Sequence, residues 1–336
     1  MSEGTIRLGH GSGGTLTRQL IEEMLRRHFD SPLLASLPDS ATVVVHGGPI
    51  AFTTDSYVVD PIFFPGGDIG KLAVFGTVND LAVVGTIPHF ISCALILEEG
   101  LPESDLHRIL ASMAAAAEEA GVEIVTGDTK VVPRGKADKI FINTAGIGIP
   151  RKGGRLPDAE MQPGDAVIVS GPLGDHGAAV LSVREGINLE GGVVSDCAPV
   201  TAIAQAVLNS AERVSFMRDV TRGGLATILN EAAERGGPGL VLNEEAIPVR
   251  PAVRAVCELL GLDPLYLACE GRIAAIVDGE SAEAVVRAVR AVTGGEECAV
   301  VGGVTKEYGG NLVARTPFGT HRLVPMLSGE QLPRIC

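Results

Sequence analysis

The chain has 336 residues, a formal net charge of −14 at neutral pH, no tryptophan and only 4% aromatic residues. The negative charge disfavours nucleic acid and anionic membrane surfaces, and so few aromatic side chains argue against base-stacking platforms. No run approaches the roughly 20 apolar residues of a membrane span, and residues 1–4 do not resemble a signal peptide, so we expect a cytoplasmic protein.

Strand-like and helix-like segments alternate along the first half of the chain after residue 40. Helices are expected at 69–85 and 102–120, and strands at 49–59, 89–97, 122–125 and 139–149. The helix at 102–120 is the best defined, because Leu106, Ile109 and Met113 recur at helical spacing. A polar segment with glycine and proline at 150–164 is typical of a linker.

The second half has a similar order of elements. Helices are expected at 177–184, 200–213, 222–235, 253–260 and 282–292, and strands at 165–170, 214–218, 265–268, 273–277 and 298–304. Residues 302–323 have the pattern of antiparallel strands, which favours a mixed α/β fold over a purely parallel sheet.

At roughly 100–200 residues per domain, this length predicts two domains. The elements divide the chain into a glycine-rich N-terminal segment (1–38), an α/β domain (39–150), a linker (151–164), a second α/β domain (165–324) and a tail (325–336). The tail has neither helical nor strand periodicity, so we expect it to be mobile. Extended, it would reach on the order of 35 Å, enough to bring the last residue into a pocket on this subunit or on a neighbour.

Six cysteines lie at positions 93, 197, 257, 269, 298 and 336, and no two of them form a CxxC pair. This spacing is typical neither of a zinc site nor of a secreted disulfide framework. Small buried core residues would account for most of them. Core packing does not explain Cys336, which ends the chain, so its sulfur is a candidate carrier of a covalently bound group.

A glycine-rich segment, Gly9–Gly14, satisfies the pattern GxGxxG. No full strand precedes it, so the dinucleotide-binding fingerprint is incomplete. It is either a flap whose amides, at Gly11, Gly13 and Gly14, contact phosphate, or a polar terminal segment without that role.

A second segment, Gly66–Leu72, resembles a P-loop but is one residue short. Leu72 also replaces the Ser or Thr that binds magnesium, so the P-loop interpretation fails. Lys71 remains as either a phosphate contact or a solvated lysine at the start of a helix.

Four aspartates lie in or beside the expected elements, at Asp55, Asp80, Asp128 and Asp219. Asp80 is inside an otherwise apolar helical segment, where an ionised carboxylate needs a partner. Carboxylates are the ligands that Mg²⁺ prefers, and bridging cations would allow so acidic a protein to hold ATP. Each aspartate taken alone could instead be a cap or turn residue.

The segment after Asp219 connects a strand to a helix. We expect Thr221 to cap that helix, with Arg222 and the amides of Gly223 and Gly224 forming an anion site at its start. Further along, Glu270 lies between two apolar strands, where burial would raise its pKa and favour a role as a base. An ion pair with Arg272 is the alternative for that glutamate.

Five motifs together resemble the HypE family of hydrogenase maturation factors: His10–Gly14, Asn79–Asp80, Gly127–Lys130, Arg218–Gly224 and the terminal Pro333–Cys336. The aspartate and glycine motifs are shared with the wider superfamily of aminoimidazole ribonucleotide synthetase, selenophosphate synthetase and thiamine-monophosphate kinase. The terminal Pro-Arg-Ile-Cys discriminates between these families. One departure is Cys269, where an asparagine is expected beside the glutamate.

The resemblance implies a homodimer of two-domain chains, with ATP bound near the dimer interface and Mg²⁺ held by aspartates. The matching metal positions are Asp55, Asp80, Asp128 and Asp219. Asn79 and Lys71 match weaker phosphate-site positions.

The resemblance also implies a reaction. A HypF-like carbamoyltransferase would load a carbamoyl group onto Cys336, and this chain would use ATP to dehydrate the S-carboxamide to a thiocyanate. The cyano group would pass to iron on a HypC–HypD complex, for nickel–iron hydrogenase. Glu270 and Lys130 would transfer and position protons, with His10 a weaker candidate.

Two other functions remain open. A small-molecule kinase or synthetase of the same superfamily would use the aspartates but leaves the terminal cysteine unexplained. A non-catalytic carrier of a modified cysteine would explain the tail but leaves the aspartates unexplained.

Overall fold

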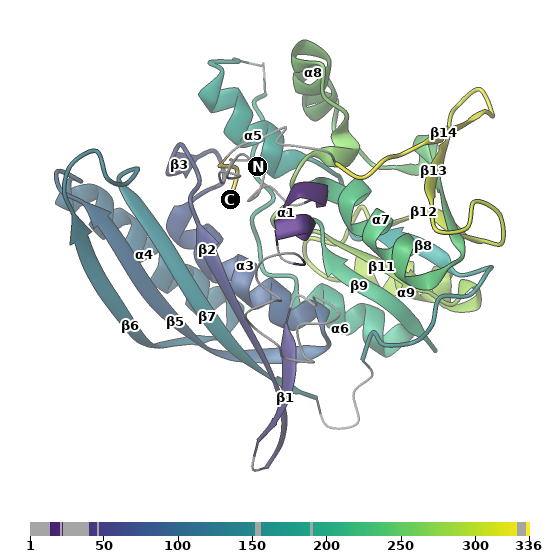
Figure 1. Cartoon of the computed structure of the whole chain (residues 1–336), viewed down its shortest axis with the longest axis horizontal. Coiled ribbons are helices and arrows are strands. Elements are labelled where there is room, and N and C mark those ends of the chain that lie inside the picture. Colours follow the sequence, from purple (N-terminus) through teal and green to yellow (C-terminus); the bar gives the residue numbers. More distant parts are fainter. Residues whose placement is uncertain are drawn as a thin grey trace, which may run out of the picture.

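The computed structural model describes residues 14–20, 22, 40–45, 47–151, 156–188, 191–327 and 334–336. Two α/β units pack side by side, each built on its own sheet (Figure 1). No helix in these ranges is long and apolar enough to cross a membrane. The predicted mixed α/β class with two such units is confirmed, whereas the exact domain boundaries stay a prediction.

The first sheet has the strand order β1-β2-β7-β5-β6. Its strands are β1 (Ala41–Val45), β2 (Gly48–Tyr57), β5 (Thr86–Glu98), β6 (Glu123–Val132) and β7 (Ile140–Pro150). Only β5 and β6 run parallel, because helix α4 (Glu103–Ala120) makes the crossover between them. A small hairpin of β3 (Phe63–Phe64) and β4 (Gly67–Asp68) precedes helix α3 (Ile69–Val83).

Helix α3 is central to the molecule and buried on nearly every side. Apart from Lys71, Asn79 and Asp80, its residues are apolar or small around the whole circumference, as expected of a helix enclosed by protein. The Asp68 side chain caps it by accepting hydrogen bonds from the amides of Gly70 and Lys71 at 2.8 and 3.1 Å. The predicted helix at 69–85 is therefore confirmed.

The second sheet has the order β14-β13-β10-β12-β8-β11-β9. Its strands are β8 (Ala166–Val169), β9 (Val214–Asp219), β10 (Gly239–Asn243), β11 (Ile273–Val277), β12 (Ala299–Thr305), β13 (Leu312–Arg315) and β14 (His321–Leu323). Both faces are covered, so a strand such as β11 is apolar at every position: Ala274 and Ile276 face one core, Ile273 and Ala275 the other.

Helices complete the second unit on both faces of that sheet. Helices α6 (Thr201–Ser210) and α9 (Ala282–Arg290) share one core, and α7 (Gly224–Gly236) lies in the other. Helices α5 (Asp175–Arg184) and α8 (Pro251–Leu260) instead join the core around α3, which ties the two units together. Other helical segments in the described part of the chain are α1 (Gly14–Leu20) and the 3-10 turns at Glu244–Ala246, Pro264–Tyr266 and Gly279–Ser281.

Three expectations about the elements are corrected. The predicted strand at 265–268 is wrong: Pro264–Tyr266 forms a 3-10 turn, which Asp263 initiates by accepting a hydrogen bond from the Leu265 amide at 3.0 Å. Strands β1 and β10 were not predicted. Within 302–323 the antiparallel pattern is confirmed for β13 and β14, whereas β12 pairs antiparallel with β10 and β13 runs parallel to β10.

We expect Leu72→Ala in α3 to destabilise the protein by about 2–5 kcal/mol, because the side chain is fully buried and its removal leaves a cavity. Leu259→Ala is the matched control, since Leu259 is 66% exposed and its loss should change stability by less than about 0.5 kcal/mol. Urea unfolding of both variants measures the difference. Equal midpoints would show that α3 does not carry the core.

Candidate functional site

The last three residues of the chain are docked against its own first unit. Cys336 is 7% exposed and Ile335 4%, and both belong to the core around α3. The amides of Val58 and Asp60 donate to the carbonyls of Cys336 and Arg334 at 3.3 and 3.1 Å, an antiparallel pairing just beyond β2. Figure 1 shows the C-terminus beside β3 and α5. In this arrangement the terminal residues pack against their own subunit, while the use of a neighbouring subunit stays a prediction.

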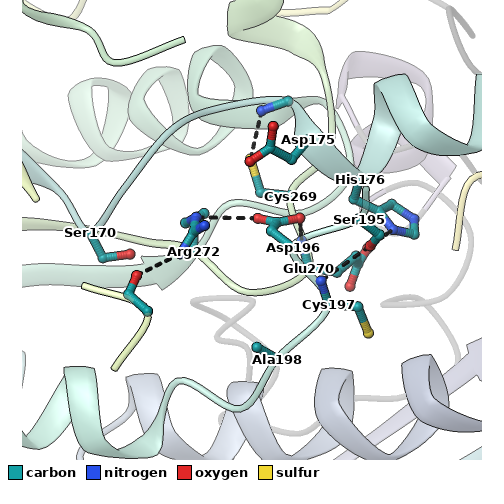
Figure 2. Close-up of polar contacts among 12 residues, drawn as sticks. Ser170, Asp175, His176, Ser195, Asp196, Cys197, Ala198, Cys269, Glu270 and Arg272 are labelled. Atoms are coloured by element: carbon teal, nitrogen blue, oxygen red, sulfur yellow. Dashed lines mark hydrogen bonds and ion pairs between the residues drawn. The ribbon is translucent and has the colours of Figure 1, made fainter. Parts of the chain in front are cut away.

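The side chain of His176, at the start of α5, binds the backbone of the docked tail. Its Nε2 lies 2.7 Å from the Ile335 carbonyl oxygen and its Nδ1 2.8 Å from Ser195 Oγ, which in turn accepts from the Cys197 amide at 3.1 Å. Because a carbonyl only accepts, Nε2 carries the proton and Ser195 donates to Nδ1. Figure 2 shows His176 and Ser195 side by side. Burial lowers the pKa of His176 to about 4, so the ring is neutral at physiological pH.

Arginines add charged contacts to the same tail. The Arg334 guanidinium lies 2.9 Å from Asp138 and 3.7 Å from Asp60. Arg184 on α5 donates to the Arg334 carbonyl at 2.8 Å. The tail is thus recognised through three backbone carbonyls and through the side chains of Arg334 and Cys336.

The sulfur of Cys336 lies in an acidic environment. Burial raises the pKa of the Cys336 thiol to about 12; the Arg222 guanidinium opposes this shift, while Glu270, Asp55 and Asp219 add to it. Four other predicted site residues, from both halves of the chain, thus influence the pKa of Cys336 electrostatically. At neutral pH the docked sulfur is a protonated thiol.

Glu270 is a buried carboxyl, 3% exposed, in the loop before β11. Burial is the main reason that its pKa lies well above the usual range, with Asp219 and Asp196 adding to the effect and Arg222 opposing it. The alternative ion pair with Arg272 is wrong, because that arginine pairs with Asp196 at 3.5 Å. A carboxylate with so high a pKa takes up a proton readily, which suits a base.

Asp55 and Asp80 share a second part of this site. Tyr57 Oη donates to Asp55 Oδ2 at 3.2 Å, and Thr53 Oγ1 donates to Asp80 Oδ2 at 2.8 Å. Burial, followed by the charges of Asp55 and Asp80, raises the pKa of Tyr57 well above its usual value. Both carboxylates therefore face the region where β2 meets α3.

Asp128 and Lys130 lie elsewhere. The predicted strand at 122–125 continues to Val132, so both residues are within β6 rather than after it. Strand β6 is the outer edge of the first sheet (Figure 1), and the two side chains are 64% and 69% exposed and bonded to each other at 2.7 Å. One chain does not bring them to Cys336.

The donor set fits a divalent cation only in part. Among the described residues, no three His, Cys, Asp or Glu side chains lie close enough to hold a metal ion by themselves. Asp55, Asp219 and Glu270 nevertheless repel one another electrostatically, which a cation would relieve. Such a site leaves room for oxygens from phosphate, as is usual for Mg²⁺.

The expectations at the glycine-rich helix start are partly corrected. Gly223, in the left-handed conformation at φ 78°, is the N-cap of α7 in place of Thr221, whose backbone carbonyl accepts from the Gly224 amide at 2.9 Å. A side chain at Gly224 would clash with the Leu265 carbonyl oxygen at 2.4 Å, so glycine is required for α7 to approach the turn at 264–266. Arg222 lies with Cys336, whose charge is the largest cause of its raised pKa.

The remaining candidates have other places. Lys71 donates to the Gly66 carbonyl at 3.3 Å and lies 5.5 Å from the Phe75 ring, at the start of α3. Asn79 is buried and its amide is bonded to the loop that carries Glu270. His10, Gly11 and Gly13 lie outside the described residues, and Gly14 is the first residue of α1.

We expect His176→Leu to expose the terminal thiol. Leucine cannot donate to the Ile335 carbonyl, and an unpaired buried carbonyl costs about 1–3 kcal/mol, so alkylation of Cys336 by iodoacetamide should accelerate about tenfold to a hundredfold. His176→Gln, which retains an N–H donor, is the conservative control and should react slowly. Peptide mass spectrometry measures the rates, with buried Cys257 as an internal reference. Equal rates in both variants would exclude a clamp at His176.

Comparisons with known proteins agree with this geometry. The models of the AIR synthase related protein N-terminal and C-terminal domains match residues 38–150 and 162–315. The chain therefore belongs to the AIR synthase related family, a class defined by two such α/β domains.

Individual relatives define the branch of the family. Carbamoyl dehydratase HypE of Azotobacter vinelandii is 48% identical over 336 residues, all of this chain and 98% of the relative. A crystal structure of hydrogenase maturation protein HypE in complex with ATP is 49% identical with a TM-score of 0.82, covering 99% of this chain and 100% of that one. A HypE–HypF complex has a TM-score of 0.85 at 41% identity, covering 93% and 99%. Within its family the chain is a member of the HypE carbamoyl dehydratases, which are enzymes, as the sequence motifs predicted.

Proposed function

We propose that this protein dehydrates an S-carboxamide on Cys336 to a thiocyanate, with ATP as the second substrate, and so supplies cyanide ligands for nickel–iron hydrogenase. The observation that carries this proposal is the docked terminal cysteine, whose sulfur lies with Glu270, Asp55 and Asp219. A relative that is 49% identical has been crystallised with ATP, which supports ATP as the phosphate donor.

The proposed chemistry makes a poor leaving group into a good one. The carboxamide oxygen attacks the γ-phosphorus of ATP, the bond from that phosphorus to ADP breaks, and an O-phosphorylated thiocarbonimidate, R–S–C(=NH)–O–PO3, forms as one N–H proton is lost. A second N–H proton then leaves, the carbon–nitrogen triple bond forms and phosphate departs. The balance is one water removed from the S-carboxamide and one ATP converted to ADP and phosphate.

Glu270 is the proposed base for the protons on nitrogen. Its high pKa favours proton uptake, and the influence of its charge on the pKa of Cys336 supports a role close to the carboxamide. Arg222 would neutralise charge that develops beside the sulfur. Gly223 and Gly224 amides, at the start of α7, would contact phosphate oxygens.

Carboxylates among Asp55, Asp80 and Asp219 would bind Mg²⁺ together with phosphate oxygens, because no three described side chains could hold it alone, and the cation would neutralise charge on the transferring phosphate. Asp128 and Lys130 can join such a site only from a second copy of the chain, because they lie on the exposed edge strand β6. We therefore propose a homodimer in which two first sheets meet. Exposed apolar side chains along that sheet, among them Phe52, Ile96 and Val131, support this arrangement.

The proposed partners act before and after the dehydration. A HypF-like carbamoyltransferase loads Cys336, and a relative crystallised as a HypE–HypF complex supports that encounter. A HypC–HypD complex then receives the cyano group. Both steps require the tail to leave its docked position, because Cys336 is almost fully buried there.

Intact mass spectrometry tests the proposal. The chain carbamoylated on Cys336 should lose one water when mixed with ATP and magnesium, with one phosphate released per chain. No water loss while ATP stays intact would overturn it. ATP-dependent turnover of a free small molecule by Cys336→Ala would indicate a kinase, and transfer of the modified sulfur's group without ATP use would indicate a carrier.

A further inference from the structure

The side-chain amide of Asn79 joins the central helix to the loops of the second unit. Asn79 is 2% exposed and lies next to Asp80 on α3. Its Nδ2 donates to the carbonyl oxygens of Ala198 and Glu270 at 3.1 and 3.3 Å, and its Oδ1 accepts from the Val200 amide at 2.8 Å. Both ends of the amide are therefore engaged by protein backbone, which leaves it no free donor geometry toward a phosphate.

The backbone N–H of Glu270 is hydrogen-bonded as well as its carbonyl. Its amide donates to Asp196 Oδ1 at 3.1 Å, and its carbonyl also accepts from the Ala198 amide at 3.3 Å. Asp196 is in turn paired with Arg272, whose guanidinium donates to the Gly294 carbonyl at 2.6 Å. Figure 2 shows Asp196 between Arg272 and Glu270.

The next residue fits the loop equally closely. A Cβ at Gly271 would lie 1.9 Å from the Asp196 carbonyl oxygen, so only glycine permits this approach. The turn that carries Glu270 is thus packed against residues 196–198 and fastened to α3.

The carboxyl group of Glu270, by contrast, makes few interactions that could orient it. Its Oε1 is buried and has no hydrogen-bond partner among the described residues. The orientation of the Glu270 side chain therefore depends on how the backbone of Glu270 is positioned.

We propose that Asn79 is a positioning residue for Glu270 and not a phosphate ligand. This inference rests on the proposed function, in which Glu270 is the base. Asn79 fixes the position of Glu270 through its side-chain amide. The adjacent Asp80 accepts a hydrogen bond from Thr53, on the side of α3 proposed to face the nucleotide. One turn of a buried helix thus fixes the base relative to the acidic phosphate site, across the boundary between the two units.

Asn79→Asp is the sharpest test, because it keeps the acceptor for Val200 but turns the donor into an oxygen facing two carbonyls. We expect the single-turnover dehydration rate at saturating ATP to fall about a hundredfold, the effect of a misplaced catalytic group of this kind. The dissociation constant for ATP, from calorimetry, should be unchanged. Asn209→Asp is the matched control, since Asn209 is exposed on α6 and should alter neither quantity.

If Asn79→Asp does not fold, a second variant and a second measurement still test the inference. Asn79→Ala removes the donor without adding a charge and should show the same split between rate and ATP affinity. Hydrogen exchange of the Val200 amide should also accelerate in Asn79→Ala, because its acceptor is lost. That exchange needs no turnover, so it reports on the clamp even if the dehydration itself is not found.

Three results would overturn the inference. Weaker ATP binding with an unchanged rate at saturation would make Asn79 a phosphate ligand. An unchanged rate and unchanged ATP affinity would make it dispensable. Unaltered exchange at Val200 would show that the amide does not hold the loop. Absence of water loss in the unmodified protein would instead refute the proposed function.

Discussion

Cys336→Ala is expected to abolish thiocyanate formation completely while ATP still binds. The Cys336 sulfur is the atom of the docked tail that would carry the carboxamide. Alanine removes it without disturbing the backbone hydrogen bonds from Val58 and Asp60. Intact mass after incubation with a HypF-like carbamoyltransferase, carbamoyl donor, ATP and magnesium measures the result. Neither the carbamoyl adduct nor its dehydrated product should appear.

Cys93→Ala is the matched control, because Cys93 is a half-buried cysteine on β5 away from the tail. It should acquire and dehydrate the carboxamide like the unmodified protein. A dehydrated product in Cys336→Ala, or its loss in Cys93→Ala, would move the covalent site away from the terminus. The thiol must also leave the pocket to react: docked, its pKa is raised from 9.0 to about 12, so docking weakens as pH rises through that interval.

Glu270→Gln is expected to slow dehydration about 10²–10⁴-fold, the usual contribution of a general base. The substitution keeps the shape of the side chain and its peptide bonds but removes the group that accepts protons. Because Glu270 repels Asp55 and Asp219, its neutralisation should leave ATP and magnesium binding intact. Single-turnover mass spectrometry gives the rate.

The pH dependence of the same reaction identifies the group. Burial raises the pKa of Glu270, so its carboxylate, the active form of a base, becomes populated only as pH rises through that elevated pKa. The rate should therefore increase with pH in the unmodified protein and lose this rise in Glu270→Gln. Glu245→Gln, at an exposed glutamate in a 3-10 turn, should behave like the unmodified protein. A full rate in Glu270→Gln would assign proton removal to another residue.

The distribution of the acidic residues bears on the oligomeric state. The charges of Asp55, Asp219 and Glu270 act on Cys336 within one chain, whereas Asp128 lies on the exposed edge of the first sheet. All four aspartates can serve one site only if two chains associate along that sheet. Sedimentation that showed a monomer under assay conditions would remove Asp128 and Lys130 from the proposed site.

The sequence predicted most elements because their signals are local. Helix α4 follows helical spacing of apolar residues, and α3 is mostly apolar and ends at Val83, two residues before Gly85. The errors occur where partners distant in the sequence decide the outcome. β10 is recognisable as a strand only beside β12 and β13, and Leu265–Ala268 has strand-like residues but forms a turn because α7 packs against it through Gly224.

Site residues divide in the same way. The terminal Cys336, the aspartates, and Glu270 beside β11 stand out in the sequence, because ionisable groups in apolar surroundings need a chemical reason. His176, Ser195 and Asp196 did not stand out. Neither a histidine in the first turn of a helix nor a serine in a loop has a pattern of its own. The roles of His176 and Asp196 depend on the Ile335 carbonyl and the Glu270 amide, which are 159 and 74 residues away.

By itself, the sequence determined the fold class, the family motifs and the chemistry available at the terminal cysteine. Only the tertiary structure decided which groups meet: it put the thiol beside Glu270, bonded the amide of Asn79 to a loop instead of leaving it for phosphate, and moved Asp128 to an outer edge. The physical reason is the separation along the sequence over which each effect acts. Propensity and hydrophobic period act over a few residues, whereas desolvation, buried hydrogen bonds and the pKa shifts that follow arise only when distant segments pack together.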